Sequence, residues 1–529
     1  MPLSRPVLRG KTYAVSTRKP QATQAAERVL RAGGNAFDAA VAAMTVLAVT
    51  DPAMTGIGGD ANILVYSARE KKVHAINATG TAPQLATIDW YRQNAGGRIP
   101  VSDGLLCGTV PGVPAACHVL LDRWGTRSFS EVSADAIYLA EEGFPVSEYF
   151  LEILSAHGDK LRQYPTSARI YFPHGRMLRA GEILRNPALA DTLRALAGRD
   201  EFYKGALARS MAAFCEQNGG LFRYEDFACY EAKVEEPVSV NYRGYDVFKN
   251  ASACQGAVEL ILLNQLERHD LAALGHNSAR YIHLCVEAAK RAYGAREKYL
   301  GDQAFIDIPY DLILSKNFSG VALADFNSEG AAGHAGDTSY LAIIDKDRNA
   351  VSMTPSLHSA FGTGIAIGDT GLIFNCRGDC FVLDPKHPNA LMPGKRPRST
   401  LTPTLVLKNG EPSMVLGSPG GDDQPLRIAQ TFLNIVDFGM NIQDAIEAPR
   451  WSTTSFPATE FPQTAYPGHL AVEDRIPADV RAELSRLGHQ VETAGPWTMG
   501  ANCGITEDRE SGVLSAGADP RGDSYALAW

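Results

Sequence analysis

One threonine in the second half of the chain has a sequence setting that suits nucleophilic catalysis. Thr338 follows Gly336 and Asp337 and opens an apolar run, SYLAIID, which a polar turn separates from a second run, NAVSM. This pattern predicts a β-hairpin with Thr338 at the head of its first strand. A threonine there can cleave the bond before it, and the freed α-amine then serves as its general base. A threonine that opens a strand is more often only a good β-former, so other residues must decide.

Short polar segments downstream of Thr338 offer further groups that suit amide chemistry. They are TPSLHSAFGTG (Ser356, His358), LIFNCRGDCF (Asn375, Arg377, Asp379, Cys380), KRPRSTLTPT (Ser399, Thr400) and GSPGGDD (Gly420, Gly421). Successive glycines after a strand can direct two backbone N–H groups at one oxygen, as an oxyanion hole does. A Ser-Thr pair after basic residues can hold a carboxylate by hydrogen bonds. Taken singly, each segment is better explained as a turn or a strand end.

Other motifs for metal or cofactor chemistry fail. The chain has no HExxH and no CxxC pair, and Cys376 and Cys380 have no second pair to close a tetrahedral metal site. The S-x-x-K match at Ser16–Lys19 lacks its partner motifs, and the glycine loop GIGGD (residues 56–60) lies between helix and strand in the wrong order for a dinucleotide fingerprint. We interpret the first as chance and the second as a tight turn, and we expect neither metal nor cofactor.

Composition narrows the class of protein further. The chain has 529 residues, 45% of them hydrophobic, and a net charge of −9, which argues against nucleic-acid or anionic-membrane partners. The N-terminal residues show no secretory h-region, and the most apolar stretch, Ala39 to Val49, is too short to span a bilayer. The nine scattered cysteines are typical of reduced thiols. These features predict a cytoplasmic location.

The elements that must position these groups follow from hydrophobic periodicity. Residues 20–34 predict an amphipathic helix, and Asn35 can cap a second, buried helix, AFDAAVAAMTVLAV. The region from about residue 109 to 318 is mostly helical in pattern, with a strand pair in PVSVNYRGYDVFKN. Residues 327–336, which include His334, form the best linker candidate. After Thr338, strands predominate (SYLAIID, NAVSM, GLIFN, TLTPTLVL, PSMVLGS), which indicates layers of sheet and helix.

Taken in order, these segments resemble the γ-glutamyltranspeptidase family of N-terminal-nucleophile hydrolases nearly end to end. The resemblance rests on STRKPQATQAAERVLRAGGNAFDAAVAA, DPAMTGIGGDANILVY, TVPGVPAA and AEEGFPVS in the first half. In the second half it rests on GDTSYLAIIDKDRNAVSM, FGTGIAIGDTGLIFN, KRPRSTLTPT, GSPGG, GMNIQDAIEAPRW and GADPRGD. It implies an α+β fold, a four-layer αββα sandwich of the N-terminal-nucleophile hydrolase type built from both pieces of an autoprocessed chain.

The resemblance also implies specific roles for the residues around Thr338. Cleavage between Asp337 and Thr338 would give a large subunit (1–337) and a small subunit (338–529) that form one intertwined domain. Thr338 would attack an amide carbonyl, and Gly420 and Gly421 would stabilise the oxyanion. Ser356 would support the nucleophile, because it occupies the place of a second threonine of the family.

The positions that bind substrate in the family depart from its pattern here. Its glutamine and aspartate for the substrate's α-ammonium align with Arg377 and Cys380, its carboxylate-binding arginine with Thr79, and an asparagine with His358. A carboxylate about 4 Å from an ammonium contributes roughly 4 kcal/mol at an effective dielectric of ~20, so this exchange disfavours a cationic group. The chain is also shorter before Lys395 than members that carry a lid.

We therefore expect a pocket that contains Arg377 and no acid. Asn375 and the Ser-Thr pair, Ser399 and Thr400, are expected to bind substrate as well. Such a pocket suits a small amide that bears a carboxylate and no amine. Oxamate, hydrolysed to oxalate and ammonia, fits, and a cytosolic oxamate amidohydrolase is a branch of this family. The expected partners are this small substrate and the two subunits of one precursor, and a higher homo-oligomer stays open.

Three alternatives stay open beside oxamate hydrolysis. A shift of one residue in the alignment around Arg377 would favour a γ-glutamyl hydrolase or transferase that acts on glutathione-like amides. The missing lid would permit an acylase for bulkier amides. A family member without turnover, kept for binding or assembly, is the third.

Overall fold

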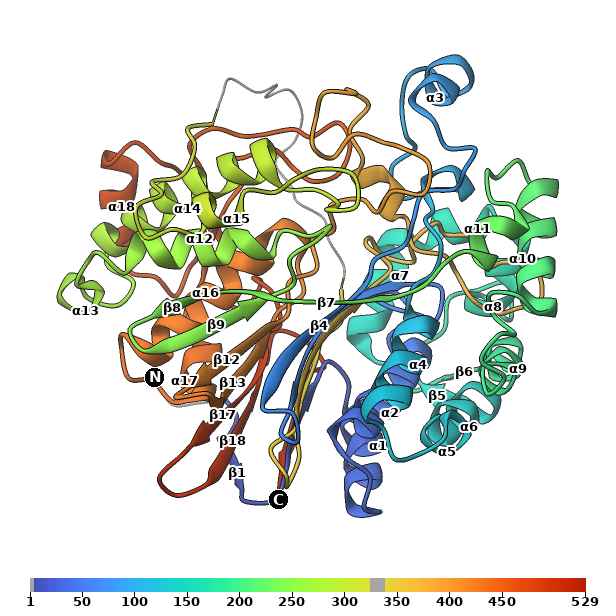
Figure 1. Ribbon diagram of the computed structural model, residues 1–529, viewed down its shortest axis with the longest axis horizontal. Helices are drawn as coiled ribbons and strands as arrows, with labels where there is room; N and C mark the ends of the chain where they lie inside the picture. Colours follow the sequence, from blue (N-terminus) through green and yellow to red (C-terminus); the bar gives the residue numbers. More distant parts are fainter. Residues whose placement is uncertain (1–3, 324–337) are drawn as a thin grey trace.

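Two seven-stranded antiparallel sheets form the centre of the molecule, which a computed structural model describes for residues 4–323 and 338–529 (Figure 1). The first sheet has the order β1-β18-β17-β13-β12-β9-β8, and the second has the order β19-β2-β10-β11-β3-β4-β7. The strands of the first are β1 (Leu8–Gly10), β8 (Val238–Tyr242), β9 (Tyr245–Lys249), β12 (Thr404–Lys408), β13 (Glu411–Gly417), β17 (Cys503–Asp508) and β18 (Val513–Ala518). Those of the second are β2 (Ala14–Thr17), β3 (Asp60–Ser67), β4 (Lys72–Ala78), β7 (Lys233–Glu235), β10 (Leu341–Ile344), β11 (Ala350–Ser356) and β19 (Tyr525–Ala528).

Helices cover the outer face of each sheet (Figure 1). On the side of the second sheet and beyond it lie α1 (Pro20–Arg31), α2 (Ala36–Thr50), α3 (Ile88–Asn94), α4 (Val113–Trp124), α5 (Phe129–Val132), α6 (Ala134–Glu142), α7 (Glu148–Arg162), α8 (Pro165–Tyr171), α9 (Pro187–Ala195), α10 (Ala206–Gln217) and α11 (Tyr224–Ala228). On the side of the first sheet lie α12 (Gly256–Leu266), α13 (Leu271–Leu274), α14 (Ala279–Tyr299), α15 (Tyr310–Ile313), α16 (Gln424–Val436), α17 (Ile442–Glu447) and α18 (Ala478–Arg486). Two small sheets, β5 (Phe144–Pro145) with β6 (Ile183–Leu184), and β14 (Trp451–Thr453) with β15 (His469–Glu473) and β16 (Gln490–Ala494), complete the strands.

The alternation of side chains along β10 shows how the layers pack. Leu341 and Ile343 join the core that the second sheet shares with α1, α2 and α4. Ala342 and Ile344 point to the opposite face and pack between the two sheets. A third core lies between the first sheet and helices α12, α14 and α16. The four-layer αββα sandwich is thus confirmed.

The second sheet mixes segments from the two halves of the chain. Strand β10 pairs with β2 on one side and with β11 on the other, and β11 pairs with β3. Strands from before residue 324 and from after residue 337 therefore share one hydrogen-bonded sheet, and neither half completes it alone. The predicted linker at 327–336, with His334, and the predicted cleavage residue Asp337 lie outside the described residues.

Local predictions agree with the structure in most places. The Asn35 side chain accepts hydrogen bonds from the amides of Phe37 and Asp38 and caps the buried helix α2 as expected. The predicted strand GLIFN (371–375) is wrong, because only Ile373 forms an isolated bridge, to Ala366. The backbone at the end of this segment forms hydrogen bonds with a loop and not with a neighbouring strand. The Asn375 amide donates to the Gly58 carbonyl at 2.9 Å.

Two further features concern the cysteines and the helices. All nine cysteines are free thiols, and only Cys229 is exposed. Within residues 4–323 and 338–529, no helix combines the length and apolar character needed to cross a bilayer.

Candidate active site

Thr338 lies just before β10, at the end of the sheet where this strand enters between β2 and β11. The residue is 1% exposed, and the amide of the next residue, Ser339, donates to the Pro355 carbonyl at 3.0 Å, which anchors the strand entrance against β11. Thr338 Oγ1 lies 3.2 Å from Ser356 Oγ and 3.5 Å from Gln424 Nε2. The predicted nucleophile is therefore held between two polar side chains from different elements.

Ser356 ends β11 and links Thr338 to the adjacent loop. Its Oγ accepts a hydrogen bond from the His358 amide at 2.7 Å, which fixes the hydroxyl beside Thr338. In the β11–β3 register Ser356 lies directly opposite Asp60. The serine can therefore orient the threonine hydroxyl, as the sequence predicted for it, but this role stays a prediction.

The glycine loop between β13 and α16 lies close to the same threonine. Gly420 has a φ of +118°, which side chains rarely adopt, and the Arg427 guanidinium packs against the place where a Cβ would lie, so glycine is strongly favoured there. Gly420 and Thr338 line one cavity, and Gln424 at the start of α16 reaches Thr338. A loop that leads into a helix N-terminus presents backbone N–H groups and a positive dipole end, which suits an oxyanion. The oxyanion role of Gly420 and Gly421 stays a prediction.

Arg377 is fully buried, and its guanidinium is matched by a carboxylate. Its Nε and Nη2 donate to the two oxygens of Asp60 at 3.0 and 3.1 Å, and its Nη1 donates to His358 Nδ1 at 2.8 Å and to Thr400 Oγ1 at 3.0 Å. The expectation that no acid faces Arg377 is wrong. The loop that we interpreted only as a tight turn delivers Asp60 to the first position of β3, where it forms a bidentate ion pair.

His358 continues this buried cluster towards the second half of the LIFNCRGDCF segment. Its Nε2 lies 2.9 Å from Asp379 Oδ1 and 3.5 Å from Cys380 Sγ. Burial raises the pKa of the Cys380 thiol well above its usual value, so the sulfur is a neutral thiol and not a nucleophile. His358, Asp379 and Cys380 could together hold a metal ion. Because Arg377 donates to one ring nitrogen and Asp379 faces the other, the ring is already occupied and we assign no metal here.

The other predicted binding residues mainly form hydrogen bonds with neighbouring protein groups. Asn375 receives a hydrogen bond from Thr109 Oγ1 at 2.7 Å and donates to the carbonyls of Gly58 and Thr109. Ser399 Oγ accepts from the Leu401 amide at 3.0 Å. Thr400 Oγ1 accepts a hydrogen bond from Arg377 Nη1, and Asn375 Oδ1 accepts one from the Arg377 backbone amide at 3.1 Å. Their substrate-binding roles stay predictions.

Thr338 opens onto a cavity of about 450 Å³. The volume lies in the range of small-molecule sites. Its lining residues are Arg18, Met54, Tyr149, Glu152, Thr338, Pro419, Gly420, Arg427, Trp497, Thr498, Gly500, Ala501 and Arg521. Arg377, Ser399 and Thr400 are not among them. The cavity is therefore separate from the buried cluster around Arg377.

Sequence reasoning missed three residues of this site. Asp60 was hidden in a glycine loop, and Arg18 lay in an S-x-x-K match that we dismissed as chance. Gln424 directly follows GSPGGDD and is the first residue of α16. Its place at the start of the helix that follows the glycines was the available signal. In each case the partner is remote in sequence, so that local pattern alone could not supply the contact.

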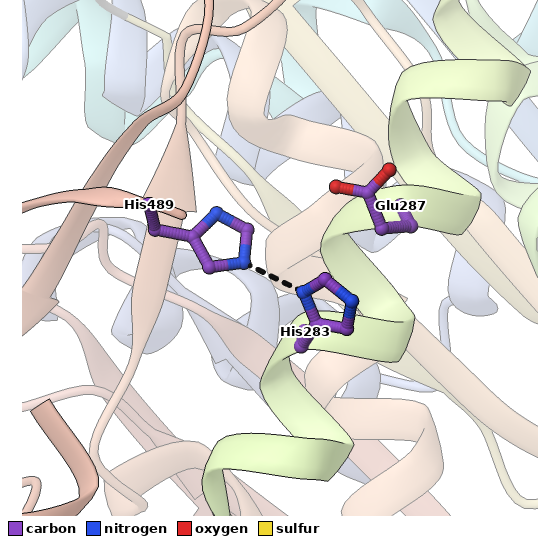
Figure 2. Close-up of side chains that lie close together, drawn as sticks. All are labelled: His283, Glu287 and His489. Atoms are coloured by element: carbon purple, nitrogen blue, oxygen red, sulfur yellow. Dashed lines mark hydrogen bonds between the residues drawn. The ribbon is translucent and has the colours of Figure 1, made fainter. Parts of the chain in front are cut away.

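A second polar cluster joins helix α14 to the residue just before strand β16 (Figure 2). His283 Nδ1 lies 2.9 Å from His489 Nε2, and Glu287 lies one turn further along α14 (Figure 2). These three residues could hold a metal ion. Lys290 Nζ already donates to Glu287 Oε1 at 2.6 Å and matches its charge, so we assign no metal to this cluster either.

From the His283–His489 pair we predict that the stability of the folded protein depends on pH. Burial, with Lys290 and His283 nearby, lowers the pKa of His489 below its ordinary value, although Glu287 opposes the shift. The unfolded chain therefore binds more protons just below pH 6.5, and stability should fall as the pH drops through this window. Replacing His489 with glutamine should reduce the loss of thermal stability between pH 7.5 and pH 5.

Thermal midpoints measured at both pH values would test this prediction. Some loss should persist in the variant, since burial also lowers the pKa of His118 and His276. Replacing the exposed His269 with glutamine is the matched control and should leave the wild-type difference unchanged. An unchanged pH difference in His489→Gln would contradict the prediction.

Comparison with known proteins places this geometry in context. Residues 22–529 match the family model described as Gamma-glutamyltranspeptidase. The chain is 36% identical over 514 residues to a "Glutathione hydrolase-like YwrD proenzyme" of Bacillus subtilis (strain 168), covering 96% of each chain. It is 32% identical over 520 residues to an "Oxamate amidohydrolase proenzyme" of Klebsiella pneumoniae, covering 96% of this chain and 97% of that one. Among solved structures, a cephalosporin acylase from Bacillus halodurans superposes with a TM-score of 0.91 at 34% identity, covering 100% and 98% of the two chains.

Proposed function

Because the chain belongs to the γ-glutamyltranspeptidase family, we propose that it is a proenzyme that cleaves itself between Asp337 and Thr338 and then hydrolyses a carboxylate-bearing amide. The chain is an enzyme of the amide-hydrolysing kind that this family comprises. Names of relatives from Bacillus and Klebsiella include the word proenzyme, which supports two subunits from one precursor. The cytoplasmic location stays a prediction.

The observation that carries the proposal is the setting of the Thr338 hydroxyl. Its Oγ1 lies within 3.5 Å of Ser356 Oγ and Gln424 Nε2 and shares a cavity with the glycine loop. After cleavage, the α-amine of Thr338 takes the hydroxyl proton as Oγ1 attacks the amide carbonyl. The same proton then passes to the leaving amine, which departs as the C–N bond breaks. Water hydrolyses the resulting ester and restores the threonine.

Oxamate is the simplest substrate that this proposal names. One relative is named for oxamate, and the described cluster beside Ser356 combines Arg377, His358 and Thr400. The Asp60 carboxylate does not favour oxamate, since it already matches the charge of Arg377. γ-Glutamyl hydrolysis or transfer is the second candidate, because Asp60 and Asp379 leave acids in the cluster where an ammonium group would bind.

A direct comparison of substrates tests the proposal. Ammonia release by the processed protein would be measured from oxamate and from a γ-glutamyl amide at equal concentration. We expect turnover of the carboxylate-bearing amides and none of acetamide. Release from oxamate alone would support the oxamate assignment, and release from the γ-glutamyl amide alone would replace it. Turnover of none of them by processed protein would refute the proposed function.

A further inference from the structure

Gln424 is a buried glutamine that contacts the predicted nucleophile. It is the first residue of α16, it is 0% exposed, and it does not line the cavity onto which Thr338 opens. Its Nε2 lies 3.5 Å from Thr338 Oγ1. Because the side chain does not line the cavity, its contact with the threonine does not depend on a substrate group.

The orientation of the Gln424 amide follows from its other contact. The backbone N–H of Thr402 donates to Gln424 Oε1 at 3.2 Å, and an N–H group cannot accept a hydrogen bond. The amide oxygen therefore faces Thr402, and the NH2 group faces Thr338. An NH2 group can only donate, so Thr338 Oγ1 must accept from it. The threonine's own hydrogen then stays available for another acceptor, and after cleavage the α-amine is that acceptor.

The residue that orients the Gln424 amide is itself fixed. Lys249 Nζ donates to the Thr402 carbonyl at 3.2 Å and to Thr402 Oγ1 at 2.9 Å. Lys249 is 0% exposed and is paired with the buried carboxylate of Glu259. The glutamine is therefore oriented by a rigid part of the first sheet before any substrate binds, as a side chain that acts on a reacting atom requires.

The backbone of Gln424 also connects the nucleophile with the glycine loop. Its N–H donates to the Gly421 carbonyl, and the Asp423 amide donates to the Gly420 carbonyl at 3.0 Å. A trans peptide is planar, with its C=O and N–H on opposite sides, so a bond to the Gly420 carbonyl also fixes the direction of the Gly421 N–H. One residue thus joins Thr338 to the loop that is predicted to bind the oxyanion.

We propose that Gln424 is a further catalytic residue, which holds the Thr338 hydroxyl in position and stabilises Oγ1 as its proton leaves. This inference rests on the proposed function and adds a residue to its mechanism. The Oγ1–H bond breaks as the α-amine takes the proton, and Oγ1 forms its bond to the amide carbon. Charge builds on Oγ1 during this step, and a preorganised N–H donor stabilises it. A contact of 3.5 Å is long, as hydrogen bonds of catalytic groups often are before substrate binds.

Gln424→Met tests this role, because methionine has a similar volume and no hydrogen-bond donor. We expect kcat to fall by about 10- to 100-fold and KM to stay within about 3-fold, since the lost contact is with the reacting atom. Gln430→Met is the matched control. Gln430 is a buried residue of the same helix that donates to the Leu426 and Trp451 carbonyls. This control should lower the thermal midpoint and leave kcat unchanged.

Gln424→Glu adds a measurement that a purely structural role would not change. Glutamate has the same shape, and its carboxylate would lie close to the α-amine of processed Thr338. A carboxylate there favours the ammonium form and raises the pKa of that amine, so the acid limb of the kcat/KM profile should move to higher pH by about one pH unit. Gln424→Met removes the donor without adding a charge, and should leave this limb in place.

Four kinetic results would overturn the role of Gln424. They are no loss of kcat in Gln424→Met, a rise in its KM alone, an equal loss of kcat in Gln430→Met, and an unchanged acid limb in Gln424→Glu.

Self-cleavage gives a further measurement, which needs no substrate. In a time course on denaturing gels, the Gln424→Met precursor should be converted to two bands more slowly than the wild type, because the same hydroxyl attacks the bond to Asp337. Equal rates would overturn the role of Gln424. If the processed wild type turns over no amide, the proposed function fails, and the rate of self-cleavage still decides the role of Gln424. An uncleaved, inactive wild type would overturn both proposals.

Discussion

Thr338→Ala is expected to remain a single full-length chain of 56.9 kDa and to lose amide hydrolysis by roughly 10⁴-fold or more. The alanine removes the hydroxyl that lies 3.2 Å from Ser356 Oγ and 3.5 Å from Gln424 Nε2, which is the proposed attacking group. We expect the variant to lose two reactions at once, because in the proposed mechanism the same hydroxyl opens the bond to Asp337 and later attacks the substrate. Denaturing gel electrophoresis and ammonia release measure the two losses.

Thr338→Ser is the matched control for that experiment. Serine keeps a hydroxyl and the same α-amine after cleavage, so it should process and turn over substrate, more slowly than threonine. Two bands in the alanine variant, or one uncleaved band in an active wild type, would contradict the assignment of Thr338. A wild type that is processed but inactive on every amide would instead support a binding or assembly role.

The sequence predicts this site well where local contacts create it. The hairpin behind Thr338 and the Asn35 cap depend on residues a few positions apart, and their turn and capping signals are direct. The proposed substrate-binding side was predicted less well, because its main contact joins Arg377 to Asp60 across 317 positions. Nothing in GIGGD distinguishes an acid that ends a turn from one that begins a strand and meets an arginine.

The same limit applies to Arg18. Its hydrogen bonds to Tyr149 and Ser524, and the cavity that it lines with Thr338, join three segments that are remote in the sequence. The four-residue pattern at Ser16–Lys19 therefore carries no information about the cavity. The resemblance to a family indicated Thr338 as the nucleophile and the glycine loop beside it. The contacts of residues that differ from the family's pattern could be identified only from the fold.

Asp60→Asn is expected to destabilise the protein by about 3–5 kcal/mol, the typical cost of removing one partner of a buried ion pair. Asp60 and Arg377 are both 0% exposed, and the asparagine would leave the guanidinium with one carbonyl oxygen in place of a carboxylate. The measurement is the unfolding midpoint in denaturant or heat. Arg377→Met should be similarly costly, since it leaves the Asp60 carboxylate buried without its cation.

The double variant Asp60→Asn with Arg377→Met separates a structural role of the pair from a role in substrate binding. It removes both charges, so much of the lost stability should return, because the desolvation penalty disappears with the ions. If Arg377 only balances Asp60, the double variant should also keep its KM for a carboxylate-bearing amide. If Arg377 binds the substrate carboxylate, stability would return while KM stays raised. Asp60→Asn alone would then bind such a substrate more tightly than the wild type, because its arginine would have lost the competing carboxylate.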